Sequence, residues 1–351
     1  MASRDFFIHQ NYVLMDRGYP FLKGVGSLEN KFLGDNLSAI GKPIFVCGLA
    51  RSGTSVVTQM LQTHPDLGSL LYKDLPMLAM PYFWSFVSDW YYRGVKPHQR
   101  PHKDGLKIDP NTPDAFEEFL WRKELDDYQK DQLSTWLGAD FADPSLEQCL
   151  KSIIPKVVFI RKAKRYLSKG NYNLFRIQYL ASLFPDSQFV LCFRNPFDHA
   201  HSLARVHALF STQENKYAGD QMAILGHYEF GPQRQALGDK KAQEKAWKAG
   251  ADYEGYLYQW LEVYQGVYDH YLSDKILRKR ILLFDNEALV RSPQKRLQEL
   301  FKFCDLSVTP SNIKKLSEKV HQRNVYKASE KIPEKLKKDV EALYKKLKSH
   351  L

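Results

Sequence analysis

The chain has few of the features that would tie it to several common protein classes. Its four cysteines, Cys47, Cys149, Cys192 and Cys304, are scattered without a C-x-x-C pair or a Cys/His cluster, so neither a zinc site nor a disulfide framework is indicated. No stretch reaches the roughly 18 apolar residues of a membrane span, and the first residues lack the apolar core of a signal peptide. We therefore expect a soluble protein in the cytoplasm.

Acidic residues are also fewer than basic residues. Lysine and arginine outnumber them 51 to 40, which gives a formal net charge of +11. This excess favours an anionic ligand, such as a nucleotide, a nucleic acid, an anionic lipid or an acidic glycan, without choosing among them. The 44% hydrophobic and 13% aromatic content can supply a large core, which excludes global disorder.

Apolar runs alternate with segments of helical periodicity along the chain. This alternation indicates an α/β fold with a parallel sheet. We expect strands at 43–47, 188–193 and 280–284, and helices at 55–63, 173–184, 196–210 and 293–304. A further helix at 253–271 carries aromatic residues that are expected to face the core rather than to stack on bases.

The sequence predicts a single domain over residues 1–351. Residues 1–42 read as an N-terminal wrapping arm, 43–306 as a nucleotide-binding and catalytic core, and 307–351 as a basic helical tail. The core contains two polar insertions, near 93–115 and 212–250. Such segments in a compact α/β protein are usually lids or substrate loops.

The stretch GLARSGTS, residues 48–55, follows the first predicted strand. Its two glycines have the spacing of an ATP-binding P-loop, but Thr54 stands where that loop needs lysine, and Arg51 comes three places earlier. Backbone N–H groups and the start of a helix still make an anion-binding turn here. The missing lysine argues against a magnesium–triphosphate complex and favours a shorter anion.

A second candidate anion site follows the strand at 188–193. Arg194 lies at the strand end, where α/β proteins bind ligands, and Ser202 lies in the second turn of the next helix, which Asn195 and Pro196 begin. The two side chains can hold a phosphate together. Alternatively, Arg194 pairs with Asp198 and Ser202 is a small packing residue.

The two sites together carry a family resemblance. PIFVCGLARSGTSVVTQMLQTHPD resembles the 5′-phosphosulfate loop of sulfotransferases, and FVLCFRNPFDHAHS resembles their 3′-phosphate motif, R-x7-S. LSKGNYNLFRIQYLASLFPD and ILLFDNEALVRSPQKRLQELFKFCDL also resemble family segments. The resemblance is closer to the bacterial, protein-tyrosine and carbohydrate enzymes than to the cytosolic small-phenol enzymes. The C-terminal G-x-x-G-type nucleotide-binding motif of the latter is not visible in this sequence. Lys327 is a weak substitute for that motif.

The resemblance implies a three-layer fold, with helices on both faces of a parallel sheet and long insertions on the substrate side. It implies transfer of a sulfuryl group from 3′-phosphoadenosine 5′-phosphosulfate (PAPS) to a hydroxyl or amine, leaving 3′,5′-diphosphoadenosine (PAP), without a metal. Arg194 and Ser202 would hold the 3′-phosphate. The 5′-phosphosulfate would be held by Arg51, Ser52, Gly53, Thr54 and Ser55, and Arg51 would also neutralise charge on the bridging oxygen.

The general base is less clear than the donor site. Asp74 is the first candidate and His64 the second, although Asp74 could be a loop acid paired with Lys73 and His64 part of a helix-ending turn. The resemblance adds Lys169 to the sulfuryl site, with a solvated surface lysine as the alternative. His98 and His102 are read as loop residues, and no metal site is expected.

Two other functions compete with the sulfotransferase hypothesis. One is an NTP-dependent kinase with a degenerate P-loop; the other is a non-catalytic basic protein that binds anions or nucleic acid, although no nucleic-acid-binding motif is present. The acceptor is expected to be a glycan or a small metabolite. A phenol, a lipid or a secondary metabolite also carries the hydroxyl group that the reaction needs.

Overall fold

The centre of the protein is a five-stranded sheet in the order β2-β5-β1-β6-β7, with all neighbours parallel. The computed structural model describes residues 2–37, 40–125, 135–212, 216–238, 240–320 and 332–351. A separate antiparallel pair, β3-β4, lies in the first insertion. The strands are β1 (Ile44–Cys47), β2 (Leu67–Gly68), β3 (His98–Gln99), β4 (Lys107–Ile108), β5 (Arg165–Lys169), β6 (Gln188–Phe193) and β7 (Ile281–Asp285).

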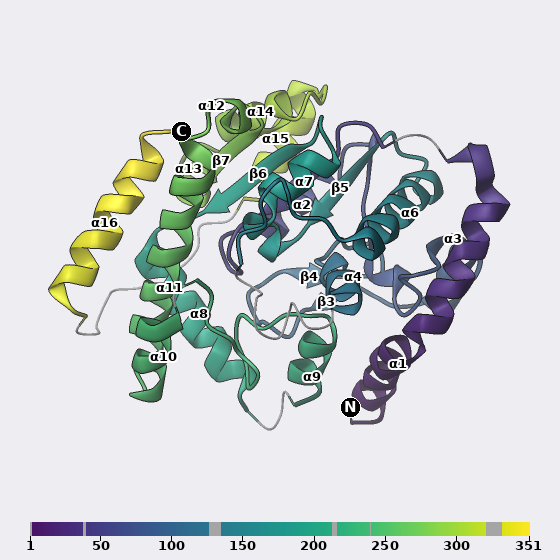
Figure 1. Ribbon diagram of the computed structural model, residues 1–351, viewed down its shortest axis with the longest axis horizontal. Helices are drawn as coiled ribbons and strands as arrows, with labels where there is room; N and C mark the ends of the chain where they lie inside the picture. The colour runs from purple at the N-terminus through teal and green to yellow at the C-terminus, as the bar shows by residue number, and fades with distance from the viewer. Residues whose placement is uncertain (1, 38–39, 126–134, 213–215, 239, 321–331) are drawn as a thin grey trace.

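Helices cover both faces of the sheet (Figure 1). They are α1 (Ala2–Leu33), α2 (Thr54–Leu61), α3 (Pro81–Tyr91), α4 (Glu117–Glu124), α6 (Pro144–Ile160), α7 (Ile177–Leu183), α8 (Pro196–Phe210), α9 (Lys216–Ile224), α10 (Lys240–Lys248), α11 (Asp252–Val267), α12 (Lys275–Arg278), α13 (Asn286–Arg291), α14 (Pro293–Phe303), α15 (Pro310–Ser317) and α16 (Glu334–Lys348).

The strands are apolar almost throughout because both of their faces are buried. Successive side chains point to opposite faces, so Phe45 and Phe189 join one core cluster while Ile44 and Val190 join the other. The first cluster is the larger and is covered by helices that include α1, α6, α8 and α11; the second is covered by α2, α14 and α15. The three-layer architecture is thereby confirmed.

Most of the predicted elements are present with close boundaries. All three predicted strands are found, and the predicted helices after β1, β6 and β7 are α2, α8 and α14. The helix expected over 173–184 instead begins with a 3₁₀ turn, Asn171–Phe175, and continues as α7. Strand β5 was not predicted from the sequence.

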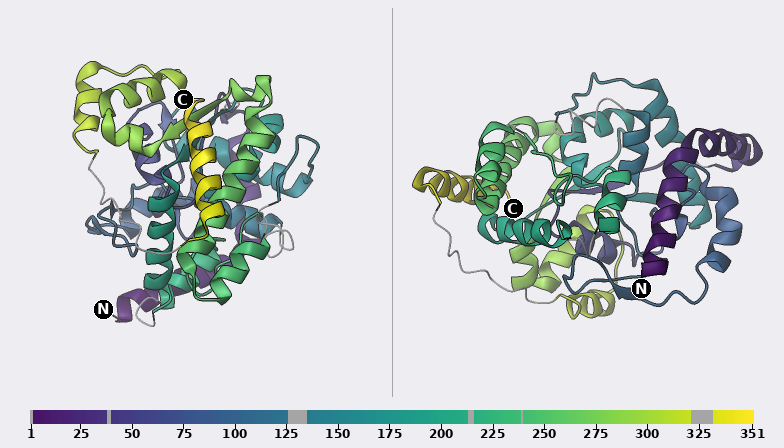
Figure 2. Two further views of the ribbon diagram at one scale, coloured as in Figure 1. Left: turned by 90° about the vertical axis from the view of Figure 1, so that its left-hand side faces the viewer. Right: turned by 90° about the horizontal axis from the view of Figure 1, so that it is seen from below.

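Residues 2–33, part of the predicted wrapping arm, form the single long helix α1, which lies on the opposite side of the molecule from α16 (Figure 2). Met15, Tyr19 and Leu22 are buried in the larger core cluster. Gly26 permits the close approach, because a Cβ there would lie 2.1 Å from the Ala79 carbonyl oxygen. Helix α1 is thus packed against the core from Met15 to Gly26.

Helix α11 carries the aromatic stripe, and its side chains face the core as expected. Tyr256, Trp260 and Tyr264 are buried. The tail helix α16 packs on α11 and buries Leu336, Val340, Leu343 and Leu347, while all of its lysines except the half-buried Lys348 are exposed. Lys327 lies outside the described residues.

Strand β1 lies between β5 and β6; the connection that leaves β1 runs to β2 at one edge of the sheet, whereas the connection that leaves its neighbour β6 runs to β7 at the other edge. Parallel α/β sheets bind ligands at the carboxyl ends of the strands near such a point. Gly48, Lys169 and Arg194 all lie at or just beyond the carboxyl ends of β1, β5 and β6.

Candidate active site

The loop between β1 and α2 has the constrained backbone of an anion-binding turn. Gly48 has φ 136°, and a Cβ at this position would lie 2.3 Å from the carbonyl oxygen of Cys192. Arg51 has φ 75°, in the left-handed region that non-glycine residues seldom adopt. Gly53 precedes α2, whose first N–H groups have no carbonyl partner within the helix. These donors and the helix N-terminus favour a negatively charged ligand.

The Arg51 side chain connects the two predicted anion-binding motifs. Its Nε donates to Oγ of Ser202 at 3.1 Å, and its Nη1 donates to Oδ2 of Asp104 at 2.7 Å. The side chain is 9% exposed and that of Asp104 is 8% exposed, so this ion pair is shielded from water. The sequence predicted Arg51 and Ser202 as parts of one donor site, and the structure brings them into contact.

A second arginine, Arg100, comes from the first insertion. Its guanidinium also binds Asp104, and its Nη1 donates to Oγ of Ser55 at 3.3 Å. Burial raises the pKa of Asp104, but hydrogen bonds and charge from Arg100 and Arg51 outweigh burial and hold it well below its ordinary value. Asp104 is therefore an anion held between two arginines beside the loop.

Lys169 ends β5 and forms an ion pair with Asp114. The Asp114 carboxylate also accepts from the Tyr72 hydroxyl at 3.1 Å and from the N–H of Ala115 at 2.8 Å. Burial raises its pKa, but Lys169 and Arg100 more than offset this effect and the pKa lies below the ordinary value. Lys169 is 7% exposed, so it is not a solvated surface lysine.

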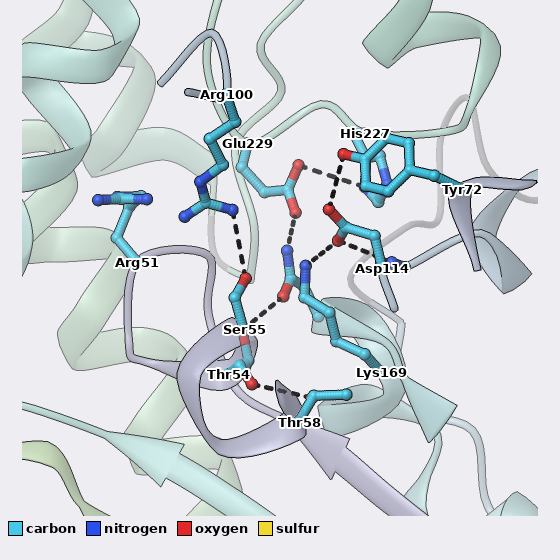
Figure 3. Close-up of polar contacts among 12 residues, drawn as sticks. Arg51, Thr54, Ser55, Thr58, Tyr72, Arg100, Asp114, Lys169, His227 and Glu229 are labelled. Carbon is cyan, nitrogen blue, oxygen red and sulfur yellow. Dashed lines mark hydrogen bonds and ion pairs between the residues drawn. The ribbon is translucent and has the colours of Figure 1, made fainter. Parts of the chain in front are cut away.

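A third group links the loop to the second insertion (Figure 3). The Thr54 hydroxyl donates to Oδ1 of Asn171 at 3.3 Å, and Nδ2 of Asn171 donates to Oε1 of Glu229 at 2.7 Å. The other oxygen of Glu229 lies 3.8 Å from Nδ1 of His227. A hydrogen-bonded path thus connects the first residue of α2 to a buried carboxylate.

These three groups line one pocket. Its wall includes Arg51, Thr54, Ser55 and Lys169 of the predicted site. Both predicted insertions contribute, the first through residues such as Arg100 and Asp114 and the second through residues such as His227 and Glu229. Phe116, Met222, Leu225 and Phe230 supply apolar surface in the same pocket.

The second anion motif is assembled around Arg194. Its Nε lies 3.6 Å from Oε1 of Glu287 and a guanidinium nitrogen lies 4.0 Å from Asp198, while Asn195 caps α8 through Phe197 N at 2.9 Å. The Nε of Arg194 is buried and makes no hydrogen bond among the described residues. Burial, together with a hydrogen bond to Asp285 and its charge, raises the pKa of Glu287 to about 7.

The two predicted candidates for the general base, Asp74 and His64, lie outside the pocket wall. Asp74 is buried in an ion pair with Arg161, and its Oδ2 accepts from the N–H of Leu71 at 2.7 Å; Lys73 pairs with Asp89 instead. His64 follows α2 and lies 3.1 Å from the carbonyl oxygen of Ser307. Both contacts are structural, and neither side chain is placed to meet an acceptor in the pocket.

Sequence reasoning missed Arg100, Asp104, Asp114, Asn171 and Glu229. Four of these five belong to the two insertions, which were recognised as substrate loops without any single residue being singled out. Asn171 lies two positions after Lys169, at the end of strand β5, and because that strand was not predicted, no strand end marked it. Within the described ranges, no three His, Cys, Asp or Glu side chains gather as a metal site would require, and no helix is long and apolar enough to cross a membrane.

Comparison with known proteins identifies the family. A family model described as "Sulfotransferase family" matches residues 43–310. The chain belongs to the sulfotransferase family. Its structure is similar to that of sulfotransferase STF9 from Mycobacterium avium, with a TM-score of 0.59 and 14% identity over 99% of this chain and 85% of that chain.

Sulfotransferase STF1 from Mycobacterium tuberculosis H37Rv matches with a TM-score of 0.49 and 12% identity, over 89% of this chain and 79% of that chain. No curated protein matches the chain in sequence. The family predicted from the two phosphate motifs is confirmed, and the likeness to STF9 confirms the sulfotransferase fold. Neither match names an acceptor.

Proposed function

We propose that this protein transfers the sulfuryl group of PAPS to a hydroxyl or amine of an acceptor bound in the pocket, and releases PAP. The observation that carries this proposal is the contact between Arg51 and Ser202, because it joins the two phosphate motifs into one continuous anion site. The family membership supports the reaction class, and the pocket beside the loop supplies room for an acceptor.

The residues present fit the two charged ends of PAPS. The phosphosulfate end meets the N-terminus of α2, the hydroxyls of Thr54 and Ser55, and the guanidinium of Arg51. The 3′-phosphate end meets Arg194 and Ser202. The buried Nε of Arg194, which makes no hydrogen bond among the described residues, is the kind of donor that a phosphate satisfies.

Catalysis in this proposal rests on position and charge. As the bond between sulfur and the bridging oxygen breaks, negative charge grows on that oxygen, and Arg51 stabilises it. Lys169 lies in the same pocket wall and adds positive charge near the transferred group. The acceptor approaches from the side formed by the insertions, opposite the leaving phosphate, so that transfer proceeds by in-line displacement. A glycan or a small hydroxylated metabolite satisfies this chemistry.

Calorimetric titration with PAP in the absence of magnesium tests the proposal. Wild-type protein is expected to bind PAP, and Arg194→Ala to bind it about 10- to 100-fold more weakly, since a charge-assisted contact with a phosphate is lost. Arg291→Ala, which removes an exposed arginine of α13, is the matched control and should leave the affinity unchanged.

Two outcomes would overturn the proposal. Binding of ATP only when magnesium is present, without binding of PAP, would favour the kinase. Salt-sensitive binding to DNA without affinity for PAP would favour the non-catalytic basic protein.

A further inference from the structure

Two carboxylates, Asp114 and Glu229, line the pocket, and a third, Asp104, pairs with two arginines of the pocket wall. Cations hold Asp104 and Asp114. Asp104 is held by Arg51 and Arg100. Asp114 accepts from Lys169, from Tyr72 and from a backbone N–H. Both groups have a pKa below the ordinary value, so they are weak proton acceptors.

Glu229 differs from both of these carboxylates. Its side chain is 2% exposed and has no arginine or lysine within ion-pair distance among the described residues; its nearest basic group is His227. Oε1 accepts from Asn171, whereas Oε2 has no partner at hydrogen-bond distance in the part of the chain that the structure describes. The hydroxyl of Tyr172 also lies beside this carboxylate. A buried carboxylate oxygen without a donor is costly unless another molecule supplies one.

The position of Glu229 relates it to the donor loop. Asn171 bonds both to Glu229 and to the hydroxyl of Thr54, so only one side chain separates the carboxylate from the first residue of α2. Figure 3 shows Glu229 above the start of α2, between Arg100 and Asp114. A hydroxyl that donates to Oε2 is thereby held on the insertion side of the loop.

We propose that Glu229 is the general base of the reaction, an inference that rests on the proposed sulfotransferase function. The acceptor hydroxyl donates to Oε2, and its oxygen attacks the sulfur of PAPS. A new oxygen–sulfur bond forms while the bond to the bridging oxygen breaks, and that electron pair stays on the phosphate of PAP. The hydroxyl proton passes to the Glu229 carboxylate. Asn171 is the positioning residue, because its amide holds this carboxylate in place.

The other candidate bases are less well placed. Asp74 and His64 lie outside the pocket wall. His102 lines the pocket, but burial and the charges of Arg100 and Arg51 lower its pKa well below the ordinary value. His227 lies beside Glu229 and is the alternative that the experiment must separate from it.

The pocket wall also suggests suitable probes. Phe116, Met222, Leu225 and Phe230 lie in the same wall as Glu229 and accommodate an aromatic or aliphatic body. Benzyl alcohol keeps its proton at every working pH and needs a base. In contrast, 4-nitrophenol is mostly ionised at mildly alkaline pH and does not need one.

Release of PAP from PAPS should be followed with each of these two acceptors and with water alone. The proteins are the wild type, Glu229→Gln, Glu229→Asp and His227→Gln. The amide of Glu229→Gln can still accept from Asn171, so its melting temperature and its affinity for PAP should match those of the wild type. Its transfer to benzyl alcohol and to water should fall by roughly 10²- to 10⁴-fold, while transfer to 4-nitrophenol changes by only a few fold. Glu229→Asp should recover part of the loss.

Each contrary result has a distinct meaning. Equal losses with both acceptors, or no loss with benzyl alcohol, would overturn Glu229 as the base. A selective loss in His227→Gln instead would assign the role to the histidine. Failure of the wild type to bind PAP would overturn the proposed function itself, and this inference with it.

Discussion

The two walls of the pocket differ in both origin and charge. The wall beside the sheet comes from strand ends and carries cations, Arg51 and Lys169, together with the backbone donors of α2. The opposite wall comes from the two insertions, which contribute the carboxylates of Asp114 and Glu229, the guanidinium of Arg100 and, outside the wall, the Asp104 carboxylate that pairs with Arg51 and Arg100. The sheet therefore builds the anion site, and the insertions build the surroundings of the acceptor.

This difference explains how one pocket can serve two opposite demands. A phosphosulfate needs fixed positive charge and N–H donors, whereas a hydroxyl that is about to react needs a proton acceptor. Asp104 comes from the first insertion, as does Arg100, yet its carboxylate also pairs with Arg51 of the loop after β1. Changes on each wall should therefore alter different measured quantities.

The largest effect is expected from Arg51. Arg51→Ala should lower the rate of PAP formation from PAPS by roughly 10²- to 10³-fold, because it removes the charge that stabilises the leaving oxygen. Arg51→Lys should retain part of the activity. The control is Lys107→Ala, which removes an exposed lysine of the first insertion. A loss confined to PAP affinity, with the rate at saturation unchanged, would contradict the catalytic role.

A smaller effect, of opposite sign, is expected from Asp104. Its carboxylate competes with the donor for Arg51 and Arg100, so Asp104→Asn should tighten PAP binding by about tenfold, equivalent to about 1.4 kcal/mol. Calorimetry at fixed ionic strength measures this change. Asp109→Asn is the control, because the contacts of Asp109 are with Asn111 and Thr112. Weaker binding in Asp104→Asn would show that the carboxylate helps to order the site instead.

A weaker dependence on pH is expected at the other end of the donor site. The pKa of Glu287 is about 7, so Glu287 is largely protonated below that pH and negatively charged above it. The charged form lies beside Arg194 and repels a phosphate. PAP affinity should therefore fall, by about tenfold at most, as pH rises through 7, and Glu287→Gln should flatten this dependence. A rise in affinity over the same range would contradict the assignment of the 3′-phosphate to Arg194.

The smallest effect on turnover is expected from Asp74. Asp74→Asn breaks a buried ion pair with Arg161 and should lower the free energy of unfolding by about 3 kcal/mol. The rate of the folded enzyme should change less than twofold, because Asp74 does not line the pocket. Denaturant unfolding and PAP release, measured on the same preparation, separate the two effects. If Asp74→Asn were folded but inactive, Asp74 would again be the candidate for the general base.

The sheet side of the site could be predicted because its residues adjoin apolar strands. Arg51 and Arg194 each follow a buried run, and the pattern of glycines and hydroxyls is typical of an anion-binding turn. Strand β5 escaped prediction because RYLSK is short and half polar. The polar side chains at its two ends find their partners only in the folded protein. Arg165 donates to the carbonyl oxygen of Lys42 at 2.8 Å, and Lys169 pairs with Asp114.

The insertion side could not be predicted residue by residue. Asp104 and Glu229 lie more than a hundred positions apart in the sequence, and neither has a local pattern that distinguishes it from a surface acid. Helix α1 is a related case, since Pro20 and several glycines argue against a helix. Burial of Met15, Tyr19 and Leu22 overrides that local preference.

A crystal structure of the complex with PAP would show whether the two phosphate motifs form one donor site. We expect the 3′-phosphate within hydrogen-bond distance of Arg194 and Ser202, the 5′-phosphate at the N–H groups of Thr54 and Ser55, and the Asp104 carboxylate displaced from Arg51. PAP bound elsewhere, or at the loop with Arg194 still facing only Glu287 and Asp198, would contradict this expectation.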